Sequence, residues 1–402
     1  MNPPARNRAA AQPEPAGTVY PILLLVSVTH LLNDMMQSVI PALYPLLKEK
    51  FGFTFAQIGL ITLVFQLASS ILQPLVGRYA DRHPQPYSLT AGMCFTLLGL
   101  LALAFASGFV PLLAAVALIG WGSSIFHPES SRVAQLAAGG RKGLAQSIFQ
   151  VGGNAGSAFG PLLAALVVIP YGQHAIVWFL PAALLAIVIL LRIGDWYQRQ
   201  LTVGEAAASG TGAPQLPQRK IRRALLILTA LVFSKYFYIA CMTNYFTFFL
   251  IGKFAFTVTE AQYCLFAFLA ASAVGTVAGG PLGDRFGRKY VIWGSILGAA
   301  PFALLLPYAG PGGTVALAAL VGLIISSAFS AIVVYATELM PGRVGMIAGL
   351  FFGLMFGLGG LGSAFFGWLA DRTSIEFIFR ISALLPLLGI VAGLLPDVER
   401  RR

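Results

Sequence analysis

Residues 280–289 read GPLGDRFGRK, and this stretch decides how the chain is organised. A shorter copy, GRYADR, stands at 77–82, 203 positions earlier. Two further pairs of matches keep that spacing to within one residue: KFGFT at 50–54 with KFAFT at 253–257, and GGRKG at 139–143 with PGRVG at 341–345. Several matches at one spacing indicate two copies of one structural unit, an architecture common among secondary transporters.

The composition places both copies in a membrane. Of the 402 residues, 57% are apolar and 10% are charged, whereas charged residues make up about a quarter of an ordinary soluble domain. This balance excludes an ordinary soluble enzyme. A membrane crossing takes roughly 20 apolar residues. The sequence predicts twelve crossings, at 19–47, 55–80, 87–106, 109–134, 143–169, 173–193, 222–250, 258–282, 290–308, 313–339, 343–370 and 375–395.

The expected fold is that of an all-α membrane protein with twelve transmembrane helices in two pseudo-symmetric six-helix bundles, at 19–193 and 222–395. The polar segment 194–221 separates six crossings from six and is predicted to be a flexible cytoplasmic linker. The proline-rich residues 1–18 are predicted to be a disordered tail, and 396–402 a basic tail.

The distribution of Lys and Arg predicts the orientation. With the N-terminus inside, 20 of the 26 basic residues fall in inside segments and five in outside segments, while Lys235 lies within a crossing. Positive charge favours the cytoplasmic side, so we expect both termini to be cytoplasmic. The net charge of +12 therefore indicates membrane orientation rather than nucleic-acid binding.

Several charged side chains interrupt the apolar runs. Asp34 lies near the middle of the first crossing, and His30 and Gln37 share its helix face. Lys235 lies midway along the seventh crossing, at a similar depth in the other half. A charge at the bilayer centre costs about 2.5–3.5 kcal/mol on insertion scales, so such residues usually face a functional cavity. The alternative is that these residues have a structural role only and hold neighbouring helices together.

The fourth crossing ends in SSIFHPESSR, at 123–132. Glu129 and Arg132 are three positions apart and can pair on one helix face. His127 points about 200° away from Glu129, and the proline between them removes a backbone donor. The segment is either a kinked helix end with one ion pair or part of a gate, for which Glu338 in the tenth crossing is the candidate counterpart.

The stretch at 280–289 fits the pattern G-x-L-x-D-R-x-G-R-K throughout and resembles the cytoplasmic loop signature of the major facilitator superfamily. The simpler reading is a basic loop with a helix-capping Asp, and the earlier copy departs from the pattern where HPQP replaces its G-R-K end. The resemblance implies loops that lock one conformation. The residues it implicates in gating are Gly280, Asp284, Arg285, Gly287, Arg288 and Lys289, with Gly77, Asp81 and Arg82 in the first half and Glu338 and Arg343 near the tenth crossing.

Five further blocks narrow the resemblance: HLLNDMMQSVIPALYPLL, GSSIFHPESSRVA, GLAQSIFQVGGN, FSKYFYIA and GRKYVIWGSILG. They resemble bacterial drug-efflux members of that superfamily that confer fosmidomycin resistance, over about residues 20–395. The resemblance implies a proton-driven pump of the bacterial inner membrane that works as a monomer. It also implies that the exported drug is a small anionic phosphonate.

We therefore expect drug/proton antiport by alternating access. The expected proton carriers are Asp34 and Glu129, with His127 and His30 assisting. The expected substrate contacts are the cations Lys235 and Arg132 and the cavity-shaping residues Gln37, Gln150, Asn154, Tyr236 and Tyr238. Two alternatives stay open: a proton-coupled uptake symporter for an organic anion or sugar phosphate, and a membrane receptor without transport.

No cofactor or metal is expected, and no enzymatic activity. The sequence has no G-x-x-x-x-G-K-[ST] loop for ATP and no H-E-x-x-H pair for zinc. Its three cysteines are an odd number, lie in apolar runs and show no pairing pattern. The partners expected are a small-molecule drug, protons and the lipid bilayer, without nucleic acid.

Overall fold

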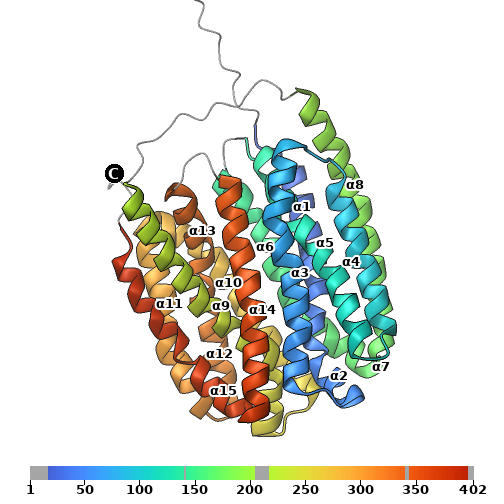
Figure 1. The fold of residues 1–402 in the computed structure, drawn as a ribbon, viewed down its shortest axis with the longest axis vertical. Helices are drawn as coiled ribbons and strands as arrows, with labels where there is room; N and C mark the ends of the chain where they lie inside the picture. Colours follow the sequence, from blue (N-terminus) through green and yellow to red (C-terminus); the bar gives the residue numbers. More distant parts are fainter. Residues whose placement is uncertain (1–16, 140–141, 204–216, 340–343, 397–402) are drawn as a thin grey trace, which may run out of the picture.

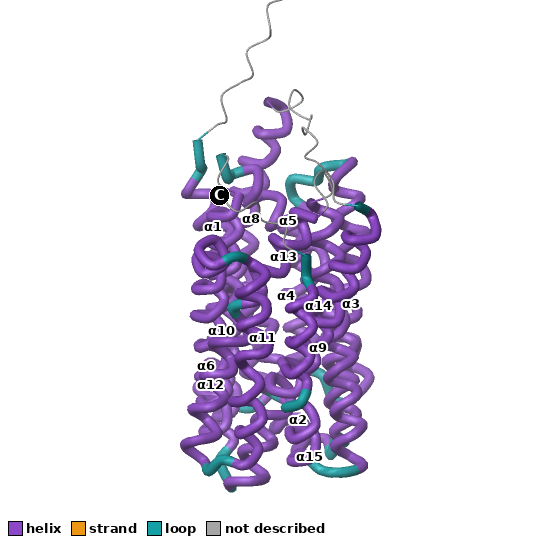
Figure 2. The backbone as a smooth tube through the Cα atoms, turned by 90° about the vertical axis from the view of Figure 1, so that its left-hand side faces the viewer, coloured by secondary structure: helices purple, strands orange, loops and turns teal. Residues whose placement is uncertain are grey.

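The computed structural model describes residues 17–139, 142–203, 217–339 and 344–396. Within these ranges the chain forms a bundle of long helices that run roughly along one axis, without β-strands (Figures 1 and 2). Twelve helical segments of this part are long and apolar enough to cross a membrane. The number of crossings predicted from the sequence is thereby confirmed.

The helices of the first half are α1 (Tyr20–Ala42), α2 (Tyr44–Phe51), α3 (Phe55–Arg82), α4 (Ser88–Phe105), α5 (Phe109–Leu136), α6 (Lys142–Leu163), α7 (Ile169–Tyr171) and α8 (Leu180–Val203). A π-helical segment, Ala164–Val168, follows α6, and a 3-10 helix, Gln173–Phe179, precedes α8.

The helices of the second half are α9 (Gln218–Phe254), α10 (Val258–Phe286), α11 (Arg288–Leu305), α12 (Pro311–Ser326), α13 (Ala328–Leu339), α14 (Val344–Arg372) and α15 (Ile375–Ser382). Two 3-10 helices, Leu306–Tyr308 and Leu385–Leu394, follow α11 and α15.

The sequence repeat is visible in the turns that begin α3 and α10. Thr54 and Thr257, 203 positions apart, are the N-caps of these helices, and each forms a reciprocal capping box with the side chain three positions later. The preceding helices both end on a residue in the left-handed conformation, Gly52 (φ 66°) and Ala255 (φ 55°). The two halves therefore repeat the same helix–turn–helix geometry.

Helices α3 and α14 form the most extensive contact between the halves and lie side by side in Figure 1. Glycines on α14 allow this approach. A Cβ on Gly360 would lie 2.8 Å from Cβ of Gln66, and one on Gly367 would clash with the carbonyl oxygen of Phe55. Small residues permit close helix packing in membranes. The contact of α6 with α10 is the second large one between the halves.

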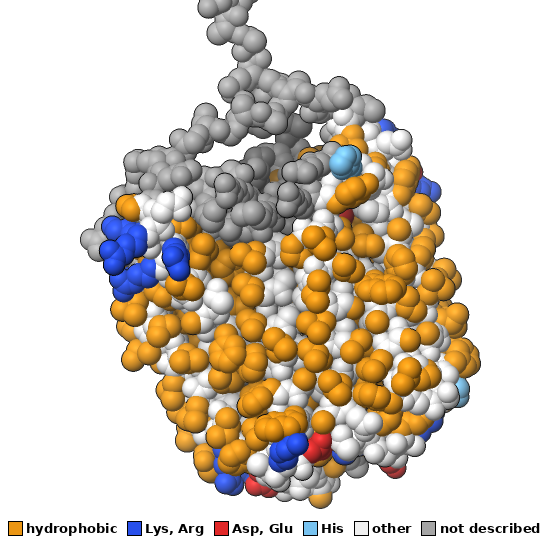
Figure 3. Space-filling view, viewed as in Figure 1, with side chains coloured by type: hydrophobic (Ala, Val, Ile, Leu, Met, Phe, Trp, Pro, Cys, Tyr) orange, Lys and Arg blue, Asp and Glu red, His pale blue; other side chains and the backbone are white. Residues whose placement is uncertain are grey.

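The outer surface fits a lipid environment. In Figure 3, apolar side chains cover the length of the visible face, and charged side chains gather toward its two ends. Many large apolar residues, such as Leu75, Val110 and Ile390, are more than half exposed. In water such a surface would be a large apolar patch, whereas in a bilayer it is the solvated face.

Three details differ from the sequence-based expectation. Helix α8 continues to Val203 and α9 begins at Gln218, so the segment between them is shorter than the linker expected at 194–221. The tenth crossing, expected as one segment at 313–339, consists of two helices, α12 and α13. The last crossing consists of two segments, α15 and the 3-10 helix that follows it, instead of one.

Candidate functional site

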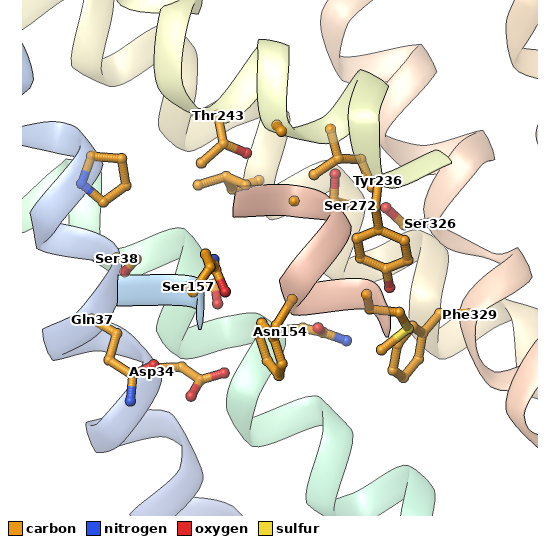
Figure 4. Close-up of a pocket in the computed structure, with 18 of the residues that line it drawn as sticks. Asp34, Gln37, Ser38, Asn154, Ser157, Tyr236, Thr243, Ser272, Ser326 and Phe329 are labelled. Carbon is orange, nitrogen blue, oxygen red and sulfur yellow. The ribbon is translucent and has the colours of Figure 1, made fainter. Parts of the chain in front are cut away.

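A cavity of about 300 Å³ lies between the two halves. In Figure 4, Asp34, Gln37, Asn154 and Ser157 come from helices of the first half, and Tyr236, Thr243, Ser272 and Ser326 from helices of the second half. The residues predicted from the sequence that line this cavity are His30, Asp34, Gln37, His127, Gln150, Asn154, Lys235 and Tyr236.

His30, Asp34 and His127 form a cluster on the first-half wall, which we call the proton cluster. Nε2 of His30 lies 3.2 Å from Oδ2 of Asp34, and Nε2 of His127 lies 3.5 Å from Oδ1. Both imidazoles are buried, whereas Asp34 retains 17% exposure. Helix periodicity predicts the contact of His30 with Asp34, four positions apart on α1. The contact with His127 on α5 depends on tertiary packing.

Backbone carbonyls hold both imidazoles in place. Nδ1 of His30 lies 2.8 Å from the carbonyl oxygen of Phe149, and Nδ1 of His127 lies 3.1 Å from that of Ser123. A carbonyl oxygen only accepts hydrogen bonds. The Ser123 hydroxyl also lies 3.2 Å from Nδ1 of His127, but its hydrogen has Oε1 of Gln37 as an acceptor at 3.3 Å, so we assign the N–H to Nδ1 in both rings. The His30 ring also stacks on Phe149, with centroids 4.0 Å apart. Each ring therefore turns its other nitrogen, Nε2, toward Asp34.

Gly153 of α6 makes room for the proton cluster. A Cβ at this position would clash with the His30 ring and would lie 2.9 Å from Oδ2 of Asp34. Gly156, one turn further along α6, faces the backbone of α1 in the same way, where a Cβ would lie 2.9 Å from the amide nitrogen of Met35. These two glycines therefore allow α6 to pack closely against α1.

The proton cluster is also where the described residues bring three potential metal-ligating side chains together, with ligand atoms within 4.8 Å of one another. Ligand atoms about 2.0–2.1 Å from a tetrahedral zinc ion lie roughly 3.4 Å apart. The two nitrogen–oxygen distances, 3.2 Å and 3.5 Å, lie near that spacing, whereas the three ligand atoms together span up to 4.8 Å, so a metal would have to draw the widest pair inward.

Lys235 of α9 is the buried cation of the cavity, with 1% exposure. Its Nζ lies 5.4 Å from the ring centroid of Tyr236 and 5.6 Å from that of Phe329. Among the described side chains no carboxylate lies within ion-pair distance of it. A buried cation without a counter-ion is costly, and aromatic faces offset only part of that cost. An anion bound at this wall would supply the counter-ion that the described side chains do not.

Glu129 and Arg132 lie apart from the cavity. They form an ion pair in which Glu129 is buried and Arg132 is 20% exposed, with Nε of Arg132 3.5 Å from Oε1 of Glu129. Arg132 also donates to the carbonyl oxygen of Ala80, at 2.7 Å, near the C-terminal end of α3. Neither side chain lines the cavity. This placement favours a role in holding α3 to α5 over the substrate and proton-carrying roles expected for Arg132 and Glu129.

Tyr238 is buried in the hydrophobic core and does not line the cavity either. Its neighbour Tyr236, two positions earlier on α9, does. Successive residues two apart on a helix point to nearly opposite sides, so one of the two tyrosines had to face away. Only the helix packing decides which.

The expected gating residues whose side chains the structure describes do not line the cavity. Gly287 has a positive φ of 93° and ends α10, where its N–H bonds to the carbonyl oxygen of Gly283, and α11 begins with Arg288 and Lys289. Arg285 lies over the Phe286 ring. Gly77 and Gly280 lie within α3 and α10. The side chains of Asp81, Arg82, Asp284 and Glu338, and Arg343 altogether, lie outside the described residues.

Cross-half contacts close one end of the cavity. Thr62 of α3 donates to Oδ1 of Asn244 on α9 at 2.7 Å, and Tyr44 bonds to Thr62. Nε2 of Gln262 on α10 donates to the carbonyl oxygen of Ala42 on α1 at 2.8 Å. These residues were not predicted from the sequence, because amides and hydroxyls in apolar runs occur equally in plain packing roles.

Asp371, at the end of α14, belongs to the same closure. Its two carboxylate oxygens accept the backbone N–H groups of Phe55 and Ala56, at 2.8 Å and 2.7 Å, at the start of α3. We call this side of the molecule, the lower one in Figure 1, the Asp371 end. A sequence signal existed: GWLADR at 367–372 has the same G-x-x-A-D-R pattern as GRYADR at 77–82.

Comparisons with known proteins agree on one family. The model of the Major Facilitator Superfamily matches residues 26–257 and 237–402. The chain is 58% identical, over 97% of its length and 96% of the relative's, to the fosmidomycin resistance protein of Escherichia coli (strain K12). It is 44% identical, over the same shares, to the uncharacterized MFS-type transporter YfnC of Bacillus subtilis (strain 168).

Solved structures show the same fold at low sequence identity. A bacterial homologue of the human lysosomal transporter Spinster, in an inward-facing and occupied conformation, has a TM-score of 0.70 at 16% identity, covering 96% of this chain and 91% of that one. A variant of the fucose:proton symporter FucP of E. coli has a TM-score of 0.64 at 16% identity, covering 94% and 99%. The chain is a multi-pass membrane transporter rather than an enzyme, and it belongs to the major facilitator superfamily.

Proposed function

We propose that the protein exports small anionic drugs such as fosmidomycin in exchange for protons, by alternating access between its two halves. One observation carries the proposal: a proton cluster centred on Asp34 and a buried, uncompensated cation, Lys235, line the same cavity between the halves. The name of the E. coli relative, a fosmidomycin resistance protein, supports the choice of substrate.

Lys235 is the proposed anion site. Fosmidomycin is a phosphonate, and an anionic oxygen beside Nζ supplies the counter-ion that the described residues do not. Tyr236, Gln150 and Asn154 line the same cavity and supply donors and acceptors for its remaining polar atoms. Ser272 and Ser326 add hydroxyls near Tyr236 (Figure 4).

The energy source follows from the charge of the substrate. An anion that leaves a cell with a negative interior gains about 2.3 kcal/mol per charge for each 100 mV. Inward movement of protons through Asp34 adds the pH gradient to that electrical term. Export therefore requires no nucleotide, and both forces act in one direction.

We propose the orientation from the distribution of basic residues: both termini cytoplasmic, in a bacterial inner membrane, and a monomer as the working unit. The Asp371 end then faces outward, and Glu129, Arg132 and the loop 280–289 lie on the cytoplasmic side. The two bundles at 19–193 and 222–395, with that loop and its copy at 77–82 as gates, remain the proposed moving parts.

The direct test uses proteoliposomes with a clamped membrane potential. Vesicles with an alkaline lumen are loaded with radiolabelled fosmidomycin and diluted into acidic buffer. Exchange predicts that the pH gradient accelerates drug release and that a pH dye reports protons entering. Asp34→Asn should abolish the acceleration while Asp195→Asn, an exposed carboxylate on α8, retains it. Unchanged release in the Asp34 variant would remove Asp34 from the mechanism.

A second candidate is uptake of an organic anion or sugar phosphate together with protons. One observation favours it: a proton on the cluster and an anion beside Lys235 attract each other across one cavity, which favours their simultaneous binding. The same vesicles discriminate, because cotransport would concentrate external drug in the alkaline lumen instead of releasing internal drug.

A further inference from the structure

We infer that His30, Asp34 and His127 bind two exchangeable protons as one unit, and that both imidazoles act through Nε2 while Nδ1 only positions the ring. The inference rests on the proposed proton coupling. It adds to that proposal the number of protons and the atoms that hold them.

When both imidazoles are neutral, neither of them presents a hydrogen-bond donor to Asp34. Each Nδ1 donates to a backbone carbonyl, so a neutral ring has a bare lone pair on Nε2. These lone pairs face carboxylate oxygens at 3.2 Å and 3.5 Å. Two lone pairs at such distances repel unless a proton lies between them, on the nitrogen or on the oxygen. We therefore assign one proton to each contact, two in all.

The net charge of the cluster follows from the number of exchangeable protons that it holds. It is +1 with two protons, zero with one, and −1 with none. Oδ1 of Asp34 also accepts from Nδ2 of Asn33 at 3.0 Å, and its contact with His127 is the longer of the two. Oδ1 therefore keeps a donor when His127 loses its proton, so His127 releases its proton first and His30 holds the second.

The surroundings leave the cluster as the proton-binding unit of the first-half wall. Helix α6 faces it with Gly153, Gln150 and Asn154, and α2 contributes Tyr44 to the cavity. Helix α9 places Lys235 on the second-half wall, and the residue of α14 against His127 is Phe356. On α5 itself, Glu129 pairs with Arg132. The other basic side chain that lines the cavity, among the described residues, is therefore Lys235.

His127 also links the cluster to the second half. Its ring lies 5.2 Å from that of Phe356 on α14, in an edge-to-face arrangement. An imidazolium interacts with an aromatic ring more strongly than a neutral imidazole does. Helix α14 also carries Asp371, which holds the start of α3. A proton at His127 therefore acts on the helix that closes the Asp371 end.

Substitution of each histidine by Asn or by Gln distinguishes the roles of its two ring nitrogens. The side-chain nitrogen of Asn falls near Nδ1 of His, and that of Gln falls near Nε2. We expect His30→Gln and His127→Gln to keep a donor to Asp34 and to transport fosmidomycin, with the ratio of protons to drug reduced from two to one. The Asn variants keep only the anchor to the carbonyl. We expect them to lose most transport, since Asp34 loses a neighbouring donor.

The readout is the proton-to-drug ratio in proteoliposomes, with chelator present throughout so that trace metal contributes nothing. A purely structural role predicts the reverse order, in which Asn restores transport and Gln does not. That order, or an unchanged ratio in both Gln variants, would overturn the inference. If the Gln and Asn variants of His30 do not accumulate in the membrane, the Gln and Asn variants of His127 test the inference independently.

Failure of this inference is distinguishable from failure of the proposed function. If wild-type protein moves drug without protons and Asp34→Asn transports normally, proton coupling itself is wrong, and the two-proton cluster falls with it. If wild-type protein and Asp34→Asn behave as proposed while each Gln variant keeps the wild-type ratio, only the two-proton cluster is wrong.

Discussion

Asp371 and Phe55, 316 positions apart, join the two halves of the transporter at one end of the cavity. The carboxylate of Asp371 accepts the N–H of Phe55 at 2.8 Å and that of Ala56 at 2.7 Å. These N–H groups belong to the first turn of α3, at the positive end of its helix dipole. A carboxylate at that position makes charge-assisted hydrogen bonds with the first turn. An opening motion that separates α3 from α14 at this end has to break both.

We predict that Asp371→Asn opens the Asp371 end. Hydrogen bonds to charged groups contribute about 1.5–3 kcal/mol, and about 1.4 kcal/mol is tenfold in a population. Open forms should therefore increase roughly tenfold or more. The measurement is labelling of Thr243→Cys, a cavity residue, by an impermeant maleimide in a background without the native cysteines. Glu376→Gln removes a charge at the same end, from an exposed pair with Arg380, and should label like the parent.

We predict opposite effects of Lys235→Gln on transport and on stability. Loss of the cation should raise KM for fosmidomycin at least tenfold, since a charged hydrogen bond of about 1.5–3 kcal/mol is lost. The melting temperature should rise, because a buried charge without a counter-ion is removed. Lys220→Gln, an exposed position on the same helix, is the matched control and should change neither value. A wild-type KM in the Lys235 variant would rule out this lysine as the anion site.

We predict that Gly153→Ala abolishes proton-coupled transport. The added methyl group would displace the His30 ring and crowd Asp34. Gly294→Ala serves as the control, because a Cβ there meets nothing within 4 Å, and replacing an open helical glycine by alanine stabilises by about 1 kcal/mol. Drug transport and thermal stability should be measured together. Full transport in the Gly153 variant would show that the cluster tolerates displacement.

We predict that Arg132→Gln lowers turnover and stability while KM for the drug stays within about twofold. Breaking a buried ion pair on one side costs roughly 3–5 kcal/mol, and α3 loses the donor to the carbonyl oxygen of Ala80. The double variant with Glu129→Gln should recover part of the stability, since no buried charge is left alone. A tenfold rise in KM would return Arg132 to the substrate site.

The sequence was sufficient for the helical fold and the number of crossings because the length of an apolar run and an internal repeat can be read directly from the chain. It also placed His30 on the helix face of Asp34 and predicted that Glu129 can pair with Arg132, because the members of each set lie about one helical turn apart. Predictions that required tertiary packing were weaker. His127 was expected to face away from Glu129, and it does, yet its contact with Asp34 depends on how α5 packs against α1.

Residues that point toward a neighbouring helix rather than the cavity could not be recognised from the chain alone. Arg132 was expected to attract the drug because it is a cation near the path, but its long side chain reaches the end of α3. Tyr236 and Tyr238 are indistinguishable by composition, and only one lines the cavity. Asp371 was missed because it stands at the end of an apolar run, where an acidic residue needs no special explanation.

The left-handed turn before α10 has a practical consequence for anyone who purifies this protein. This turn occurs twice in the chain, at 50–54 and at 253–257, and the two copies differ at one position. The first copy has Gly52 there, whereas the second holds Ala255 in a left-handed conformation that costs an alanine roughly 1–2 kcal/mol. The first copy of the turn therefore indicates glycine as the more stable residue at position 255. Ala255→Gly should yield a more heat-resistant sample for crystallisation or cryo-microscopy, at a site remote from the cavity-lining residues.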